Sequence, residues 1–82
     1  TMKFKPAAII SLFNLDLDIC VEYFSNYLEN KVELSWASKY ASLMCIEELS
    51  TLDYNSIYKD LLILFREDNH IFINTKAKEI LL

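Results

Sequence analysis

The sequence contains no glycine and a single proline, Pro6. Phosphate-binding loops, dinucleotide-binding turns and nucleophile elbows all need backbone conformations that glycine adopts at the lowest cost. Two-residue β-hairpins likewise lose their favoured Asn-Gly and Asp-Gly turns. The absence therefore argues against these folds and predicts short helices, with asparagine reversing the chain between them. The asparagines expected to do so are Asn14, Asn30, Asn55, Asn69 and Asn74.

Residues that commonly carry catalysis or bind metals are also scarce. His70 is the only histidine, and it has no second histidine or cysteine at the spacing of a zinc site. Cys20 and Cys45 do not form a CxxC motif, and we expect both to be buried thiols. A cysteine nucleophile would need an activating base and an oxyanion site, and the sequence pattern shows neither arrangement. The sequence therefore predicts a protein that is not an enzyme and that uses no cofactor or metal.

Long apolar runs are missing as well. No apolar stretch reaches the ~18 residues of a membrane span, and no segment has the pattern of a signal peptide. Together with the low cysteine content, this predicts a cytoplasmic protein with no membrane contact.

Basic residues are outnumbered by acidic ones, which gives a net charge of −4. Residues 16–30 contain acidic residues but no lysine or arginine, and a second acidic group comprises Glu47, Glu48 and Asp53. An acidic surface repels phosphate backbones, so nucleic acid is not an expected ligand. The charge instead favours a basic protein as the partner.

Apolar side chains are abundant for so short a chain. They make up 54% of the 82 residues, and aromatic residues make up 13%. A single small domain, expected to span residues 1–82, cannot bury all of this surface. We therefore expect an exposed apolar patch that contacts a partner.

Hydrophobic periodicity predicts an all-α fold of four to five short antiparallel helices in a small bundle or HEAT-like array. Pro6 suits the first turn of a helix, Asp16 or Asp18 can cap the second, and Ser35 the third. An α+β alternative remains, because "LLILF" and "HIFIN" also fit two strands of a hairpin over residues 61–74. The expected helices are 6–13, 17–30, 36–50, 55–67 (starting at Asp53 or Asn55) and 70–82.

The helix expected over residues 36–50 is apolar almost all round, which is typical of a central helix. Its only polar strip comprises Ser38, Lys39 and Ser42. Glu47 and Glu48 lie in its last turn, where the helix dipole disfavours negative charge. Either this turn extends past the core into solvent, or the two glutamates form an acidic rim beside Trp36 and Tyr40 that meets a basic partner.

An internal period of 37 residues relates "YLENKVELSWASKYASLM" to "LFREDNHIFINTKAKEIL". The alignment pairs Trp36 with Ile73 and Leu43 with Ile80. This succession, over about residues 18–82, resembles a pair of HEAT repeats. The resemblance implies stacked helices, protein binding on one helical face and no catalysis.

The sequence thus predicts a small acidic helical module that binds another protein. Its most concrete form is an inhibitor, immunity protein or antitoxin that occludes a basic surface of its partner. The alternative is a homo-oligomeric structural or adaptor protein, such as a homodimer, joined through an apolar helical seam. The predicted partner-binding residues are the aromatic anchors Trp36 and Tyr40 and the carboxylates of Glu22, Glu29, Glu47, Glu48 and Asp53.

Overall fold

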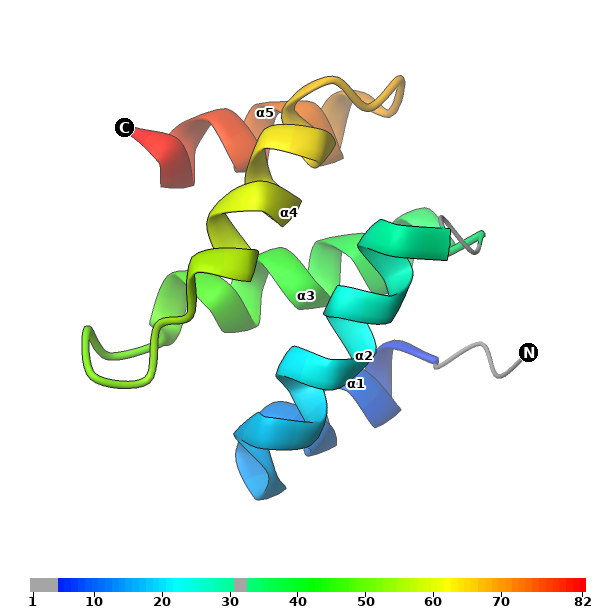
Figure 1. The fold of residues 1–82 in the computed structure, drawn as a ribbon. Coiled ribbons are helices and arrows are strands. Elements are labelled where there is room, and N and C mark those ends of the chain that lie inside the picture. The colour runs from blue at the N-terminus through cyan, green and yellow to red at the C-terminus, as the bar shows by residue number, and fades with distance from the viewer. Residues whose placement is uncertain (1–4, 31–32) are drawn as a thin grey trace.

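The computed structural model describes residues 5–30 and 33–82, and over these residues it contains five α-helices and no strand (Figure 1). The prediction of a small all-α bundle is confirmed. The alternative hairpin over residues 61–74 is wrong, because this stretch spans the end of one helix and the start of the next. The helices are α1 (Pro6–Leu15), α2 (Leu17–Asn30), α3 (Trp36–Glu48), α4 (Ser56–Arg66) and α5 (Ile71–Leu81).

Short polar side chains begin three of these helices by accepting hydrogen bonds from otherwise unpaired backbone N–H groups. Asp16 caps α2, Ser35 caps α3 and Asn55 caps α4, at donor–acceptor distances of 3.0–3.2 Å. The predicted cap Ser35 is confirmed, and of the alternatives left open by the sequence, Asp16 rather than Asp18 caps α2 and Asn55 rather than Asp53 begins α4. Asn14 and Asn74 instead lie inside α1 and α5, so asparagine reverses the chain at fewer places than predicted.

Helix α3 runs across the middle of the molecule and packs against α1, α4 and α5 (Figure 1). Helix α2 packs against α1 and α4, and α5 packs against α4 after a short connection that turns the chain at the top of the view in Figure 1. The aromatic rings of Phe13, Phe24 and Tyr58 meet at centroid distances of 5.7–6.2 Å and join α1, α2 and α4. The predicted central position of α3 is therefore confirmed.

The side of α3 that faces the core differs from the one its hydrophobic pattern suggests. Ser38 and Ser42 of the polar strip are buried, whereas Trp36 and Met44 are about half exposed. The Ser42 hydroxyl donates a hydrogen bond of 2.8 Å to the backbone carbonyl of Ser38, which reduces the cost of burying it. The buried side of α3 thus combines the small residues Ser38, Ala41 and Ser42 with the large apolar residues Leu43 and Ile46, so small size as well as hydrophobicity decides what is buried here.

Tyr58 has a fully buried side chain whose hydroxyl has no hydrogen-bond partner among the described residues. Burial, with a smaller contribution from nearby Cys20, raises the pKa of this phenol to about 12. A buried polar group without a partner costs free energy. We expect Tyr58→Phe to raise the free energy of unfolding by about 1 kcal/mol, measured by urea denaturation. Tyr54→Phe, at an exposed ring, is the matched control and should change nothing; a destabilised Tyr58→Phe protein would show that the hydroxyl is bonded.

Candidate functional site

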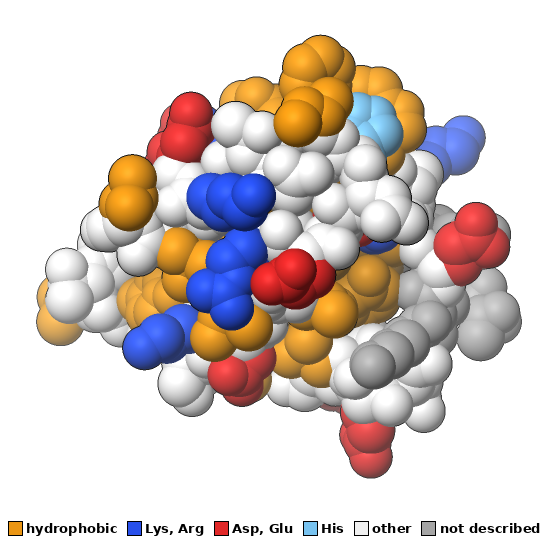
Figure 2. Space-filling view, turned by 90° about the horizontal axis from the view of Figure 1, so that it is seen from above, with side chains coloured by type: hydrophobic (Ala, Val, Ile, Leu, Met, Phe, Trp, Pro, Cys, Tyr) orange, Lys and Arg blue, Asp and Glu red, His pale blue; other side chains and the backbone are white. Residues whose placement is uncertain are grey.

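Four neighbouring side chains form an exposed cluster where α3 and α5 begin. We call Trp36, His70, Ile71 and Phe72 the aromatic patch. The indole of Trp36 lies flat on the imidazole of His70, with ring centroids 4.6 Å apart and an interplanar angle of 13°. Phe72 lies 6.2 Å from Trp36 and 5.5 Å from His70. Figure 2 shows the pale-blue histidine among hydrophobic side chains at one edge of this face.

The helical register of α5 places two of these apolar side chains in solvent. Ile73 and Ala77 are fully buried, which turns the preceding Ile71 and Phe72 away from the core. Ile71 is 64% exposed, Phe72 59% and Trp36 51%. Single exposed apolar side chains are ordinary on a protein surface, but a contiguous group of this size is typical of an interaction site.

A turn centred on Asp68 positions His70 within the patch. The Asp68 carboxylate accepts a hydrogen bond of 2.8 Å from the His70 backbone N–H and forms a 2.6 Å ion pair with Lys39 of α3. The Asn74 amide donates to the backbone carbonyl of Asp68 at 3.0 Å. The Asp68 side chain thus stabilises a glycine-free chain reversal between α4 and α5 and links this turn to α3 through Lys39. We call this network the Asp68 turn.

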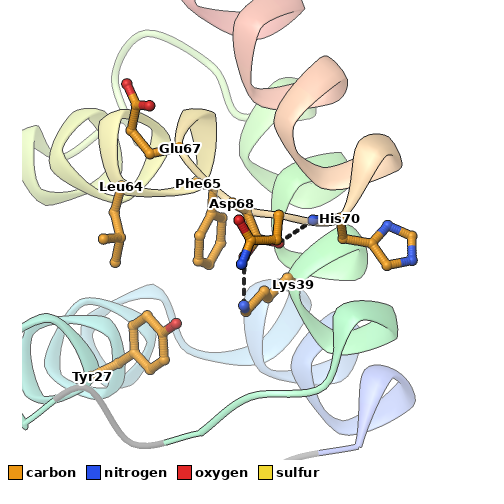
Figure 3. Close-up of a pocket in the computed structure, with 8 residues that line it drawn as sticks. Tyr27, Lys39, Leu64, Phe65, Glu67, Asp68 and His70 are labelled. Atoms are coloured by element: carbon orange, nitrogen blue, oxygen red, sulfur yellow. Dashed lines mark hydrogen bonds and ion pairs between the residues drawn. The ribbon is translucent and has the colours of Figure 1, made fainter.

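The Asp68 turn lies in an open groove beside the aromatic patch (Figure 3). Burial acts to raise the pKa of the Asp68 carboxyl, but the hydrogen bonds from Lys39 and His70 and the charge of Lys39 together lower it below its ordinary value. The Asp68 carboxyl is thus ionised at neutral pH, and it is paired with Lys39. The groove is lined by Tyr27, Lys39, Leu64, Phe65, Glu67, Asp68, Asn69 and His70.

A second, smaller groove adjoins the patch between α3 and α5. Lys76 lies in it, and its ammonium group is 2.8 Å from Glu47 and 3.8 Å from Glu79. The hydrogen bond to Glu47 raises the pKa of Lys76 above its ordinary value. Two carboxylates therefore share one lysine. The lining residues are Tyr40, Ile71, Phe72, Thr75, Lys76 and Glu79.

The structure brings only some of the predicted partner-binding residues together. Trp36 is in the patch and Tyr40 is in the adjoining groove, with Glu47 at its edge. Glu47 forms an ion pair with Lys76, so its negative charge is partly neutralised within the protein. Glu48 is exposed at the end of α3.

The remaining predicted residues lie elsewhere on the molecule. Glu22 and Glu29 are on the exposed side of α2, a helix that packs against α1 and α4. Asp53 is in the connection between α3 and α4, where its carboxylate accepts a 3.1 Å hydrogen bond from the Ser50 hydroxyl. These three carboxylates contribute to the overall acidic surface and are not part of the aromatic patch.

Sequence reasoning missed His70, Ile71 and Phe72 as members of the site. The stretch "HIFIN" fits either a strand or a core-facing helix when it is considered alone. The available signal was the position of His70 directly before a helix, since its ring Nδ1 accepts a hydrogen bond of 3.3 Å from the Phe72 N–H and so caps α5. Histidine is an uncommon cap, and the pattern therefore did not indicate one.

Neither cysteine has the surroundings of a reactive thiol. Cys20 is fully buried, and burial, with smaller contributions from Cys45 and Asp16, raises its pKa to about 11. Cys45 is only partly buried, contrary to expectation, and burial followed by the charge of Glu48 raises its pKa as well. Both thiols are therefore protonated at neutral pH and poor nucleophiles.

Within residues 5–30 and 33–82, no group of three or more histidine, cysteine, aspartate or glutamate side chains is placed to hold a metal ion. None of the helices in this part of the chain combines the length and apolar character needed to cross a bilayer. Comparison with models of known protein families, with curated proteins and with solved structures found no match. The resemblance to HEAT repeats therefore stays a prediction.

Proposed function

We propose that this chain is a small protein-binding module that uses the aromatic patch as its anchor. Its most concrete form is an inhibitor, immunity protein or antitoxin that occludes a basic surface of its partner. The observation that carries this proposal is the exposed Trp36 ring, held flat against His70 and flanked by Phe72. Tryptophan and other large aromatic side chains are enriched among the residues that contribute most to protein–protein affinity.

The stacking of Trp36 on His70 supports an anchoring role because it fixes the ring before a partner arrives. An exposed side chain normally loses rotational freedom on binding, which reduces the affinity gained. Contact with the imidazole at 4.6 Å already restricts the indole in the free protein. The Asp68 turn in turn restrains His70, because the His70 backbone N–H donates a 2.8 Å hydrogen bond to the Asp68 carboxylate.

The charges beside the patch favour a basic partner. Glu47 and Glu79 share the single ammonium group of Lys76, so one carboxylate is in excess at this edge. Glu79 is largely exposed, and its 3.8 Å contact with Lys76 is long for an ion pair. An arginine or lysine from a partner therefore finds an available carboxylate next to an apolar anchor. Complementary charge of this kind speeds association and selects partners.

Truncating the anchor tests the proposal. We expect Trp36→Ala to weaken partner binding by at least about tenfold, because it removes the largest exposed ring of the patch. The matched control is Leu52→Ala, which also truncates an exposed apolar side chain but in the connection between α3 and α4. Tagged wild-type and variant proteins would first capture the partner from the source lysate, and calorimetry on the purified pair would then give the affinities.

Three results of this experiment are informative. Loss of a stoichiometric basic partner with Trp36→Ala but not with Leu52→Ala supports the proposal. Equal binding by all three proteins would contradict it. Recovery of the chain alone, with a melting temperature that rises with protein concentration, would instead support the homo-oligomeric alternative, in which a second copy covers the apolar surface.

A further inference from the structure

Helices α3 and α5 lie side by side and run in the same direction. Both begin at the aromatic patch, where the ring centroids of Trp36 in α3 and Phe72 in α5 are 6.2 Å apart. Further along, the Glu47 carboxylate of α3 lies 2.8 Å from the Lys76 ammonium group of α5. Figure 1 shows both helices running from right to left. The smaller groove between them, which we call the α3–α5 groove, therefore has two different ends.

One end of the α3–α5 groove is apolar and the other is acidic. The apolar end is the aromatic patch, whose Trp36, Ile71 and Phe72 are more than half exposed. Glu47 and Glu79 form the acidic end, and each lies in the last turn of its helix. The C-terminal end of a helix is electronegative, so two helix dipoles add to the charge of the two glutamates. This end of the groove therefore attracts a cation.

The lysines of α5 leave part of this negative charge available. Lys76 is shared by Glu47 at 2.8 Å and Glu79 at 3.8 Å, and the side chain of Glu79 is 60% exposed. Lys78 directly precedes Glu79, but successive residues of a helix are turned by about 100°, so Lys78 lies on another side of α5. A basic side chain from a partner can therefore approach Glu79 from the groove.

The groove beside the Asp68 turn has no comparable free charge. Its two carboxylates belong to Glu67 and Asp68. Asp68 is bound to Lys39 at 2.6 Å, and Glu67 contacts Arg66 at 3.6 Å. Each carboxylate there has a cation of its own, whereas the two glutamates of the α3–α5 groove share one lysine. Charge complementarity to a basic partner therefore favours the α3–α5 groove.

The distance between the two ends of the α3–α5 groove matches the repeat of a helix. Phe72 and Glu79 are seven residues apart in α5, which places them on the same side of it and about 10 Å apart along its axis. Side chains seven residues apart on a second helix have the same separation and point the same way. A partner strand would need a sheet edge, and residues 5–30 and 33–82 contain no strand. A helix packed along α3 and α5 is therefore the element that fits.

We propose that the α3–α5 groove is the docking site for one amphipathic helix of the partner protein, which carries an apolar side chain and an arginine seven residues apart. The apolar side chain contacts Ile71 and Phe72, and the arginine binds Glu79. Arginine suits the acidic end because its planar guanidinium has five donors and can reach the carboxylates of both Glu79 and Glu47. This inference rests on the proposed function, since the aromatic patch is one end of the groove, and it adds the form of the partner segment and its second contact.

Synthetic peptides can test the groove on the free protein. The probe is an alanine-based helix of about 16 residues with a leucine and an arginine seven residues apart. One control peptide has glutamate in place of the arginine, and the other has the two residues five apart, which turns them to different sides of the helix. In NMR titrations, we expect the probe to shift the amides of the groove residues most strongly and the controls to bind at least about threefold more weakly. The amides to follow are those of Tyr40, Ile71, Phe72, Thr75, Lys76 and Glu79.

Two substitutions identify the carboxylate that binds the arginine. Glu79→Gln should raise the Kd of the probe about threefold to fivefold. Glu67→Gln is the matched control, because it neutralises an even more exposed carboxylate in the other groove, and it should leave the Kd unchanged. Amide shifts centred on Glu67, equal binding of the three peptides, or no binding of the probe would overturn the proposal. Groove amides that shift with protein concentration alone would also overturn it, because a second copy would then occupy the groove.

The natural partner, once isolated, separates this inference from the function on which it rests. If Trp36→Ala weakens partner binding but Glu79→Gln does not, the aromatic patch is the anchor and the proposed docking of a helix in the groove is overturned. If partner binding survives Trp36→Ala while Glu79→Gln still weakens binding of the probe, the proposed function fails and the groove stands as a helix-binding site.

Discussion

Leu43→Ala is expected to lower the free energy of unfolding by about 3–5 kcal/mol, the largest effect among the substitutions considered. Leu43 lies in the middle of α3 and is 0% exposed, at the point where this helix packs against its neighbours. Truncating it removes buried apolar surface and leaves a cavity that close-packed helices fill only partly. For a chain of this length, with an expected stability of roughly 4–10 kcal/mol, such a loss consumes much of the total.

The same substitution at Leu52 provides the matched control. Leu52 is 97% exposed, so Leu52→Ala should change stability by less than about 0.5 kcal/mol. Urea denaturation followed by circular dichroism is the appropriate measurement, because fluorescence from Trp36 reports on the surface. If Leu43→Ala does not fold, Leu43→Met keeps the volume and should cost less than about 1.5 kcal/mol. Equal effects at Leu43 and Leu52 would show that α3 is not the centre of the core.

Asp68→Ala is expected to destabilise the protein by about 2–3 kcal/mol, the second largest effect. The substitution removes two charge-assisted hydrogen bonds and leaves the Lys39 ammonium, which is only 21% exposed, without its partner. Glu67→Ala is the neighbouring control, since that carboxylate is 77% exposed and contacts Arg66 at 3.6 Å. Such a surface pair contributes little, and we expect a change of less than about 0.5 kcal/mol. A double-mutant cycle with Lys39→Met would measure the coupling directly.

The contribution of Asp68 should also depend on pH with a definite sign. Its pKa in the folded protein lies below the ordinary value of 3.8, so the folded state favours the ionised form. The resulting stability is present above that ordinary value and is lost as the pH falls through the folded-state pKa. The difference in stability between wild type and Asp68→Asn should therefore be constant near neutral pH and shrink below about pH 4. A difference that grows on acidification would contradict this assignment.

The starts of α2, α3 and α4 were predictable from the sequence because a short polar cap determines where each of these helices begins. Asp16, Ser35 and Asn55 can cap a helix wherever they precede an apolar-periodic segment, and the structure places them at helix starts. Lack of glycine also correctly disfavoured the hairpin alternative. These inferences need only the interactions of residues that are near one another in the chain.

The composition of the site was much less predictable, because it depends on contacts between distant segments. Hydrophobicity placed Trp36 on the apolar side of α3, yet the buried side includes Ser38 and Ser42. That reversal follows from how closely other helices approach α3, which periodicity does not encode. Lys76, on α5, forms an ion pair with Glu47 and so neutralises part of the predicted acidic rim. Because Lys76 lies 29 residues after Glu47, the sequence pattern around Glu47 gave no sign of this pairing.

The meeting of Phe13, Phe24 and Tyr58 has a consequence for the order in which the chain assembles during synthesis. The two phenylalanines are made early, on α1 and α2, but the tyrosine that packs against both comes from α4. The nascent N-terminal half therefore leaves the ribosome with this aromatic cluster incomplete. Phe13 and Phe24 therefore complete their packing only after α4 has emerged, even though α1 can already pack against α3.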